Sequence, residues 1–364
     1  MKNKIFFSHI LNDYSGSPRV LRDAIEAIKE SDIEINIITN KNIGFLSNID
    51  NVNYIYVNYS FHKNKFIQII FFLLVQIELF FKLSYFLVRA RCKGFNCKVI
   101  NNTMLPFGSG IAGFLFAKEN LYYIHEVYIK PEILKSFLLF IIDNTATKVI
   151  YVSNFLKKET KLLNVDEVVI YNVLRSDFNS IDNIDFYGKY QRKEIFFASS
   201  LKDYKGIYNL IKIAGKVPDV TFSLALNCEE KEFISFSEVC SEYRNINLYL
   251  RPSNIEELYL RSFVVLNLTI PELCIETFGL SILEGISYGC VPIVPPVGGP
   301  VELVKDNFGF KISSNNIDQV SSIINTLCND YELWLDKAMS AKSFSEKFDR
   351  EEYRSNIISI LGII

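Results

Sequence analysis

The stretch that decides the fold covers residues 271–304 and reads PELCIETFGLSILEGISYGCVPIVPPVGGPVELV. Its pattern predicts a helix, a short buried strand and a second helix, at 278–288, 291–295 and 299–304. Glu276 comes just before the first helix and Glu284 lies inside it. Eight residues of helix span roughly 12 Å at about 1.5 Å per residue, which is the scale of a diphosphate sugar. Since the first N–H groups of a helix favour anions, we expect a diphosphate site here, with one carboxylate for sugar hydroxyls and the other for ribose hydroxyls.

Three glycines in this stretch support the expectation. Gly279 allows a close approach of the backbone to a ligand, and Gly298 with Gly299 offers a second such turn. Acidic residues near a helix start are also common for structural reasons, because the helix dipole favours them. The two glutamates alone therefore leave the structural reading open, and the argument depends on the whole string.

Apolar strand-like runs and helical patterns alternate along the rest of the chain. The other expected strands are 4–10, 34–39, 52–57, 98–100, 121–126, 148–153, 167–172, 194–200, 220–226, 246–250, 263–269 and 308–312. The other expected helices are 18–30, 65–92, 108–118, 131–143, 154–163, 206–216, 229–243, 254–261, 316–328, 330–343 and 349–362. Such alternation with continuously apolar strands indicates an α/β fold with parallel sheets covered on both faces.

The chain is long enough for two domains, since domains usually run to roughly 100–200 residues. Residues 175–192 are polar and without apolar periodicity, so they predict a linker. We expect one domain over 1–178, a second over 193–345 and a last helix over 346–364 that packs back toward the first. Asn254 and Glu257 predict a helix cap with a capping-box partner. Ligands of such sheets bind beyond the carboxyl ends of the strands, and we expect the site in the cleft between the domains.

Charge and cysteine usage exclude several classes of protein. The formal net charge is −2, without the basic excess of a general nucleic-acid binder. The seven cysteines form no C-x-x-C motif, which argues against a disulfide framework and a zinc site. The N-terminal residues do not read as a signal peptide. These features predict a cytoplasmic protein.

The apolar segment 66–88 complicates that picture. Its length approaches the roughly 20 residues of a membrane span, but it contains Gln68, Gln76, Glu78 and Lys82. Charges at mid-membrane are costly, and Glu78 and Lys82 are spaced to pair on one helix face. We expect a buried or interfacial helix, and peripheral membrane contact through 66–92, with a true span as the alternative.

The string at 271–304 resembles the family 4 glycosyltransferases of the glycosyl transferases group 1, which are retaining enzymes with the GT-B fold. Their signature runs E-x-F-G-L-x-x-x-E, then G-x-P, then G-G-x-x-E. The matching residues here are Glu276, Phe278, Gly279, Leu280, Glu284, Gly289, Pro292, Gly298, Gly299 and Glu302, with Val291 lengthening the G-x-P element by one residue. The resemblance implies two Rossmann-like domains, an N-terminal acceptor domain and a C-terminal domain that binds a nucleotide-sugar donor.

The resemblance also implies roles for individual residues. The family element G-R-L-x-x-x-K-G corresponds to residues 199–206, where Lys205 matches the lysine that contacts the diphosphate, while Ser200 replaces the usual arginine. Lys202 is a candidate to compensate, because a charge-assisted hydrogen bond is about twice as strong as a neutral one. Arg251 follows a strand where the family places its nucleobase loop.

In the N-terminal half, the resemblance implies that Gly16 lies close to the donor diphosphate and that His125 lies beside the transferred sugar. Glu276, Lys205 and His125 are therefore the expected catalytic residues. The expected donor-binding residues are Glu284, Phe278, Gly279, Leu280, Gly16, Ser200, Lys202 and Arg251. No D-x-D triplet occurs, so no metal or other cofactor is expected.

The implied function is retaining transfer from a nucleotide-sugar to a glycan or lipid-linked glycan acceptor, as in surface polysaccharide synthesis. Three alternatives remain open. Ser200 suggests a nucleotide-sugar binding protein without transfer activity. The same fold also occurs in sugar epimerases and phosphorylases. The segment 66–88 would suit a membrane-anchored protein.

Overall fold

The structure is a computed structural model that describes residues 2–175, 178 and 183–363. The chain forms two α/β units, which are described separately below. Unit 1 comprises Met1–Asn172 and Arg350–Ile364, and unit 2 comprises Val173–Asp349. The boundary thus falls a few residues before the 178 expected from the sequence, and the C-terminal residues join unit 1 from Arg350 on.

Unit 1 contains a seven-stranded parallel sheet in the order β3-β2-β1-β4-β5-β6-β7. The strands are β1 (Asn3–Ser8), β2 (Ile33–Thr39), β3 (Val52–Tyr56), β4 (Asn96–Asn102), β5 (Glu119–Ile124), β6 (Lys148–Tyr151) and β7 (Asp166–Val169). The central strands are buried almost throughout, as in Ile5, Phe6 and Phe7 of β1. That burial on both faces is what their unbroken apolar runs predict for a parallel sheet.

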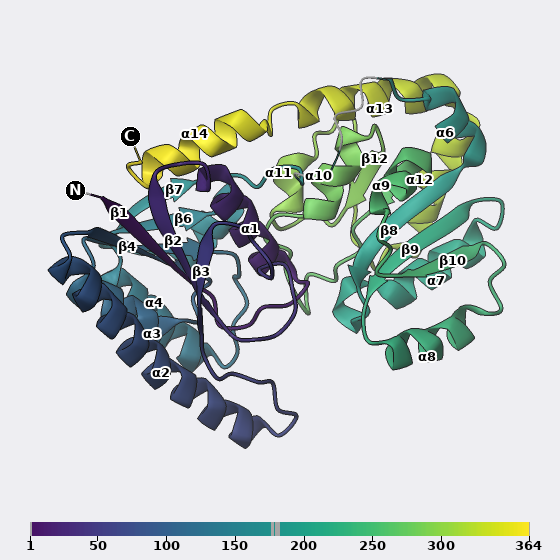
Figure 1. Ribbon diagram of the computed structural model, residues 1–364. Coiled ribbons are helices and arrows are strands. Elements are labelled where there is room, and N and C mark those ends of the chain that lie inside the picture. The colour runs from purple at the N-terminus through teal and green to yellow at the C-terminus, as the bar shows by residue number, and fades with distance from the viewer. Residues whose placement is uncertain (1, 176–177, 179–182, 364) are drawn as a thin grey trace. The chain divides into compact units, whose positions relative to one another are not determined.

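Helices cover both faces of this sheet (Figure 1). They are α1 (Gly16–Ile28), α2 (Lys65–Cys92), α3 (Phe107–Phe116), α4 (Glu132–Thr145), α5 (Asn154–Thr160) and α14 (Arg350–Ile360). Helices α2, α3 and α4 lie side by side, and α14 packs against α1. The end of the chain is tied to the sheet, because Lys98 Nζ on β4 donates to the Leu361 carbonyl at 2.6 Å.

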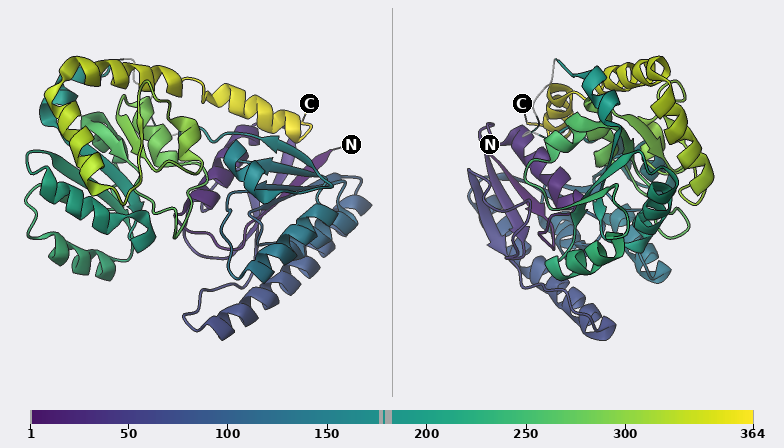
Figure 2. Two further views of the ribbon diagram at one scale, coloured as in Figure 1. Left: turned by 180° about the vertical axis from the view of Figure 1, so that it is seen from behind. Right: turned by 90° about the vertical axis from the view of Figure 1, so that its right-hand side faces the viewer.

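Helix α2 packs on the sheet through one face and leaves the other exposed (Figure 2). Val75, Leu79, Leu83 and Leu87 are fully buried against β4 and α3. Their i, i+4 spacing places all four on one stripe of the helix. Within the described residues, α2 is the one helix that has the length and composition to cross a membrane.

The two charges of α2 are satisfied within unit 1. Glu78 and Lys82 form the expected ion pair at 2.7 Å. Lys82 Nζ also donates to the Tyr56 carbonyl at 2.6 Å, and Glu78 accepts from the Asn58 backbone N–H at 2.9 Å. These bonds attach the helix to the segment that follows β3, as expected for a helix packed on the protein surface.

Unit 2 contains a six-stranded parallel sheet in the order β10-β9-β8-β11-β12-β13. The strands are β8 (Glu194–Ser200), β9 (Thr221–Asn227), β10 (Ile246–Leu250), β11 (Ser262–Leu266), β12 (Val291–Val294) and β13 (Phe310–Lys311). Its helices are α6 (Phe186–Arg192), α7 (Ile207–Lys216), α8 (Glu230–Cys240), α9 (Ile255–Arg261), α10 (Leu280–Ser287), α11 (Pro300–Leu303), α12 (Ile317–Asn329) and α13 (Tyr331–Ser345). One core cluster joins them, with Trp334 fully buried and its Nε1 donating to the Phe263 carbonyl at 2.9 Å.

The predicted linker at 175–192 is partly wrong, because α6 occupies Phe186–Arg192. This helix is attached by Phe186, Lys189 and Tyr190, which have the i, i+3, i+4 spacing of a buried stripe. The stripe is hidden in the sequence because its middle residue is a lysine. Lys189 is almost completely buried, and its Nζ donates to the carbonyls of Tyr259 at 2.9 Å and Tyr288 at 2.5 Å. Residues 176–177 and 179–182 of the predicted linker lie outside the described residues.

Two further local predictions differ from the structure. Asn254 precedes α9, but its side chain makes no cap hydrogen bond, so that predicted cap is wrong. The capping box lies instead at the start of α8, between Glu229 and Glu232. The helix expected from residue 278 begins at Leu280, because Gly279 takes a left-handed conformation with φ of 96°. The turn before α10 is therefore longer than predicted.

Candidate functional site

Each sheet reverses its strand order at one place. In unit 1 the reversal lies between β1 and β4, and in unit 2 between β8 and β11. Ligands of doubly wound sheets bind beyond the carboxyl ends of the strands at such switch points, because the connections there diverge to opposite faces. The residues that follow these four strands are therefore the first to inspect.

In unit 2, Lys205 and Glu276 meet at the switch point. Lys205 follows β8, Glu276 lies in the connection from β11 to α10, and Lys205 Nζ contacts Glu276 Oε2 at 2.5 Å. Burial alone would lower the pKa of Lys205, but the Glu276 carboxylate outweighs it and the pKa is raised. Two residues that are 71 positions apart thus form one charged pair, with both side chains partly exposed.

The backbone around Lys205 is held in place by close packing. Lys205 ends a short 3₁₀ turn, Asp203–Lys205, and Gly206 follows with φ of 77°. A Cβ on Gly206 would collide with the Leu268 carbonyl, so only glycine fits there. The Ile270 N–H donates to the Tyr204 carbonyl at 2.8 Å, which joins the turn to the connection after β11.

Two glycine turns pack against each other beside this pair. The Gly299 N–H donates to the Glu276 carbonyl at 2.8 Å, and a Cβ on Gly299 would collide with the Thr277 carbonyl. Gly298 has φ of 101°, a conformation that side chains rarely permit. The second glycine turn therefore supports the backbone of Glu276, which explains why the two motifs occur together.

Helix α10 begins directly after this turn. Gly279 is buried and Leu280, the first helical residue, is half-buried. The first N–H groups of a helix have no partner within it and can bind an anion. Phe278, expected to contact the donor, is 3% exposed and its ring packs edge-on against Phe348 at 6.2 Å. Phe278 thus belongs to the core that anchors the helix start.

Glu284 lies inside α10 and is 8% exposed. Its Oε2 accepts a hydrogen bond of 2.8 Å from the Tyr259 hydroxyl. Burial, and then the Glu284 carboxylate, raises the pKa of Tyr259 well above its usual value, so the phenol stays a donor. Tyr259 is held in turn by a ring stacked on Tyr288 and by Lys189, which bonds the carbonyls of both tyrosines.

The remaining candidates of unit 2 lie at or after the ends of strands β8 and β10. Ser200 is partly exposed at the end of β8. Lys202 is 52% exposed and lies 3.6 Å from Glu232, so it pairs with α8 and not with Glu276. Arg251 is exposed after β10, with φ of 43°. A left-handed conformation is uncommon for residues other than glycine and marks Arg251 for attention.

In unit 1, three polar side chains meet at the switch point. Asn102 ends β4, and its Nδ2 lies 3.0 Å from His9 Nδ1 and 3.1 Å from the Ser17 carbonyl. Its Oδ1 lies 2.7 Å from His125 Nε2. Because the Ser17 carbonyl can only accept, the Asn102 amide must point its NH₂ group there and toward His9. His125 therefore carries its proton on Nε2, and His9 on Nε2.

Burial keeps the imidazole rings of His125 and His9 uncharged. It lowers the pKa of His125 to about 3, with a smaller contribution from His9, and it also lowers the pKa of His9. Burial raises the pKa of the adjacent Glu126 to about 6, although the Met104 N–H bonds its carboxyl at 2.9 Å. Near neutral pH, His125 is thus an uncharged imidazole and not a general acid of ordinary strength.

Gly16 starts α1 beside this cluster and is exposed. A Cβ on Gly16 would meet no atom within 4 Å, so open space lies above the backbone. The adjacent Ser17 carbonyl is bonded by Asn102, which connects the start of α1 to the two histidines. Arg19, three residues further along α1, is 7% exposed and pairs with Asp23 at 3.1 Å.

Sequence reasoning missed Tyr259, His9 and Asn102. His9 and Asn102 had a usable signal, since each lies at the carboxyl end of a predicted strand. Tyr259 lies in a helix with ordinary apolar spacing, and no pattern in the sequence distinguishes it. Among residues 2–175, 178 and 183–363, no three His, Cys, Asp or Glu side chains gather as a metal site would require.

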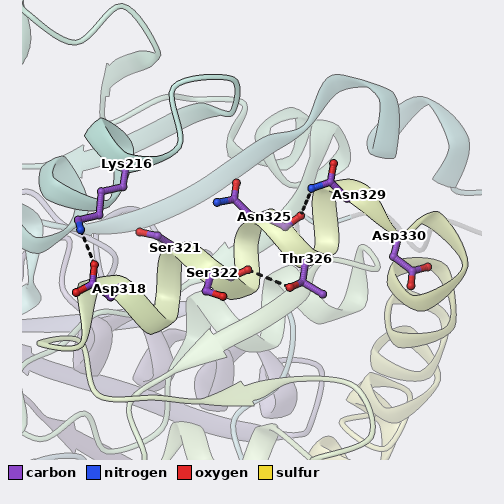
Figure 3. Close-up of a pocket in the computed structure, with 8 residues that line it drawn as sticks. All are labelled: Lys216, Asp318, Ser321, Ser322, Asn325, Thr326, Asn329 and Asp330. Carbon is purple, nitrogen blue, oxygen red and sulfur yellow. Dashed lines mark hydrogen bonds and ion pairs between the residues drawn. The ribbon is translucent and has the colours of Figure 1, made fainter.

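One hollow of unit 2 contains none of these candidates. It lies between α7 and α12 and is lined by polar side chains, including Ser322 and Asn325 (Figure 3). Lys216 and Asp318 form an ion pair across it. It is shallow and lacks both buried charge and apolar lining, so it does not suggest a catalytic site.

Comparison with known proteins adds a match to one family model and a fold. Residues 182–344 match the family model "Glycosyl transferases group 1". HepE from Anabaena, solved in complex with UDP-glucose, is 17% identical, with 99% of this chain and 100% of that chain covered and a TM-score of 0.80. A glycosyltransferase from Rickettsia africae is 19% identical, with 99% and 97% covered and a TM-score of 0.78.

Two sucrose-phosphate synthases are also similar. That of Thermosynechococcus elongatus is 14% identical, with 99% of this chain and 98% of that chain covered and a TM-score of 0.75. A probable sucrose-phosphate synthase of Oryza sativa subsp. japonica is 28% identical over 92 residues, which are 25% of this chain and 8% of the rice protein. The chain therefore matches only a small part of that curated relative.

Proposed function

We propose that this chain, which has the GT-B fold and a region that matches the Glycosyl transferases group 1 model, is a glycosyltransferase that transfers a sugar from a nucleotide-sugar with retention of the anomeric configuration. The single observation that supports this most is the contact of Lys205 with Glu276 beside the start of α10. A cation, a carboxylate and free helix N–H groups are what a diphosphate-linked sugar needs from a protein.

The proposed division of roles follows the geometry of unit 2. Lys205 and the N-terminus of α10 bind the diphosphate, and Glu276 accepts hydrogen bonds from the sugar hydroxyls. Glu284 accepts from the ribose hydroxyls, with Tyr259 fixing its carboxylate. In the reaction the bond from the anomeric carbon to the phosphate oxygen breaks and the acceptor oxygen bonds that carbon. The acceptor hydroxyl proton passes to the departing diphosphate, whose growing charge Lys205 stabilises.

His125 is proposed to accept a hydrogen bond from the transferred sugar. Its Nε2–H donates to Asn102, so its other ring nitrogen, Nδ1, has the lone pair that a sugar hydroxyl can bond. A neutral ring suits this role, because a charged imidazolium would oppose the oxocarbenium-like charge of the transition state. Since Lys205 and the helix end supply the positive charge, the proposal includes no metal ion, and transfer should continue in EDTA.

The test is turnover of defined donors by the purified chain, beginning with UDP-glucose, the ligand of the Anabaena structure. NMR of the product reports the anomeric configuration. An α-linked product from an α-linked donor agrees with retention, whereas a β-linked product would refute it. A nucleotide-sugar binding protein without transfer is the second candidate, favoured by Ser200 and by the pairing of Lys202 with Glu232. Thermal stabilisation by the donor without turnover of any acceptor would support that candidate.

We propose further that the acceptor is a lipid-linked glycan, used in surface polysaccharide synthesis at the inner face of the cytoplasmic membrane. The support is the outer face of α2, where Ile70, Leu73, Ile77 and Phe81 are exposed, with Phe81 at 66%. Contiguous exposed apolar surface on this scale suits an interface, and lysines and arginines near both ends of α2 suit anionic headgroups.

Vesicle sedimentation tests this contact. The variants Ile77→Glu and Phe81→Glu should reduce binding to anionic vesicles several-fold, because each places a charge on the proposed lipid side. Leu163→Glu is the matched control, since Leu163 is an exposed apolar residue of unit 1 outside α2. Equal binding of all three variants and the parent chain would contradict the proposed contact.

A further inference from the structure

Unit 1 contains a cavity of about 460 Å³ that none of the residues discussed as donor-binding lines. It lies at the edge of the sheet, where the segments that follow β2 and β3 meet the N-terminal half of α2. The carboxyl ends of strands are where ligands of such sheets bind. The cavity therefore has the position of a ligand site.

The walls of the cavity are fixed by hydrogen bonds. The Tyr59 carbonyl accepts from Asn40 Nδ2 at 3.1 Å, and the Tyr59 hydroxyl accepts from Gln68 Nε2 at 2.6 Å. The Val57 N–H donates to the Thr39 carbonyl at 2.9 Å. The segment after β3 is thus attached to both β2 and α2, and the site is preformed.

Two charged side chains, Lys41 and Glu78, line the cavity. Glu78 lines it, but its charge is offset by Lys82 at 2.7 Å, and both its oxygens accept hydrogen bonds from Asn58, at 2.9 and 3.1 Å. Lys41 lines it too, with its Nζ 5.8 Å from the centre of the Tyr56 ring. No carboxylate of the described residues lies within ion-pair distance of Lys41. The uncompensated charge at the cavity is therefore a cation.

Part of the cavity wall is apolar, and this apolar surface continues along α2. Phe71 and Leu74 line it, and Leu74 is 56% exposed. From Leu74 the exposed apolar face of α2 runs on through Ile77 and Phe81. A molecule that fills the cavity can thus place a polar group near Lys41 and an apolar chain along the helix.

We propose that this cavity binds the phosphate-bearing head of a lipid amphiphile, whose hydrocarbon chain lies along α2. Lys41 bonds the phosphate, which stays ionised at neutral pH, and the side-chain amide of Asn42 bonds a neighbouring oxygen atom. Phe71 and Leu74 contact the first carbons of the hydrocarbon chain, whose removal from water favours binding. The inference deepens the proposed function, since it rests on a lipid-linked acceptor and names the site that holds it.

Binding of geranyl phosphate to the full chain, measured by calorimetry, tests the proposal, because this short lipid phosphate is soluble as a monomer. Lys41→Glu should weaken binding by roughly tenfold or more, the effect of losing one charge-assisted contact. Lys118→Glu is the matched control, since Lys118 is an exposed lysine of unit 1 away from the cavity. Equal weakening in both variants would show a nonspecific charge effect and overturn the proposal.

A second arm tests the apolar side. Leu74→Asn should weaken the binding of geranyl phosphate several-fold and leave the binding of inorganic phosphate unchanged. If the parent protein binds geranyl phosphate and inorganic phosphate with equal affinity, the hydrocarbon chain makes no contact with α2 and the proposal is wrong. Because Leu74 is largely exposed, this variant keeps the core intact.

Failure of this site can be told from failure of the proposed function. The Lys205→Ala variant should lose donor turnover and keep geranyl phosphate binding, because Lys205 lies in unit 2. The Lys41→Glu variant should keep thermal stabilisation by the nucleotide-sugar and lose geranyl phosphate binding. Loss of geranyl phosphate binding in Lys205→Ala would contradict the assignment of the cavity.

Discussion

The two switch points of this protein differ in how they treat charge. In unit 2, a lysine and a glutamate are in direct contact, and the carboxylate raises the pKa of the lysine. In unit 1, two histidines share one asparagine, and burial keeps the rings uncharged. The same sheet order thus supports a charged site and a neutral one.

The difference is informative because the two sites face different demands in the proposed reaction. A departing diphosphate gains negative charge and needs a cation, while the sugar ring gains positive charge and needs neutral acceptors. The comparison predicts that loss of the Lys205 cation in unit 2 acts mainly on the rate of transfer. Changes in unit 1 should act on stability and its pH dependence as well.

The largest expected effect is that of Lys205→Ala. Removing the cation from the diphosphate site should lower kcat by about 10² to 10³, the usual cost of one preorganised donor. The measurement is donor turnover under saturating substrate. Lys202→Ala should cost less than about tenfold, since Lys202 pairs with Glu232. Lys212→Ala, at an exposed position of α7, is the neutral control.

The second effect concerns the pH dependence of stability in unit 1. His125 has a pKa of about 3 in the folded chain, below its ordinary value of 6.5. The unfolded chain therefore binds more protons, so stability is full above pH 6.5 and falls as the pH drops toward 3. Lowering the pH from 7 to 5 should therefore reduce the unfolding free energy by about 2 kcal/mol through His125 alone.

His125→Gln is the comparison variant, since its amide can still donate to Asn102. Urea unfolding should show that the variant loses about 2 kcal/mol less unfolding free energy between pH 7 and pH 5 than the parent chain does. Glu126 acts with the opposite sign, because its raised pKa of about 6 makes stability fall as the pH rises from 4.5 through 6. That contribution is common to both proteins and cancels in the difference. An unchanged acid-side loss would mean that His125 is not held neutral.

A third, smaller effect is expected for Tyr259→Phe. The change removes the hydroxyl that bonds Glu284 and leaves a buried carboxylate oxygen with one partner fewer. We expect a loss of about 1 kcal/mol of unfolding free energy and a higher KM for the donor with little change in kcat. A lower kcat at unchanged KM would place Tyr259 in the chemical step and contradict its positioning role.

The smallest effect is the alkaline stability of the charged pair. The raised pKa of Lys205 means that its contribution is full below its ordinary pKa of 10.5 and disappears as the pH rises through the folded value. Glu276→Gln should therefore be less stable than the parent by less than about 1 kcal/mol at pH 8. That gap should close as the pH rises through the folded pKa of Lys205, as a series of chemical unfolding curves at increasing pH would show.

The charged site was predictable from sequence because its parts are coded locally. Glu276, Gly279 and Glu284 lie within one short stretch, and Lys205 lies between a predicted strand and a predicted helix. What the sequence did not supply is the contact across 71 residues and the support of Glu276 by the Gly299 turn. Both depend on which strands are neighbours, which periodicity alone does not determine.

The neutral site was less predictable. His125 came only from the family resemblance, and Asn102 matters because β1, β4 and β5 are adjacent in the sheet. Helix α6 was missed for a related reason, since its buried Lys189 is stabilised by carbonyls from distant parts of the chain. A lysine in an apolar stripe makes the pattern look polar, and only the fold supplies its partners.

A crystal structure with a bound nucleotide-sugar would test the central claim most directly. The account predicts that Lys205 Nζ bonds a diphosphate oxygen at about 3 Å, that the diphosphate lies at the N-terminus of α10, and that Glu276 bonds sugar hydroxyls. A donor whose diphosphate makes no contact with Lys205 or with the N–H groups at the start of α10 would contradict it.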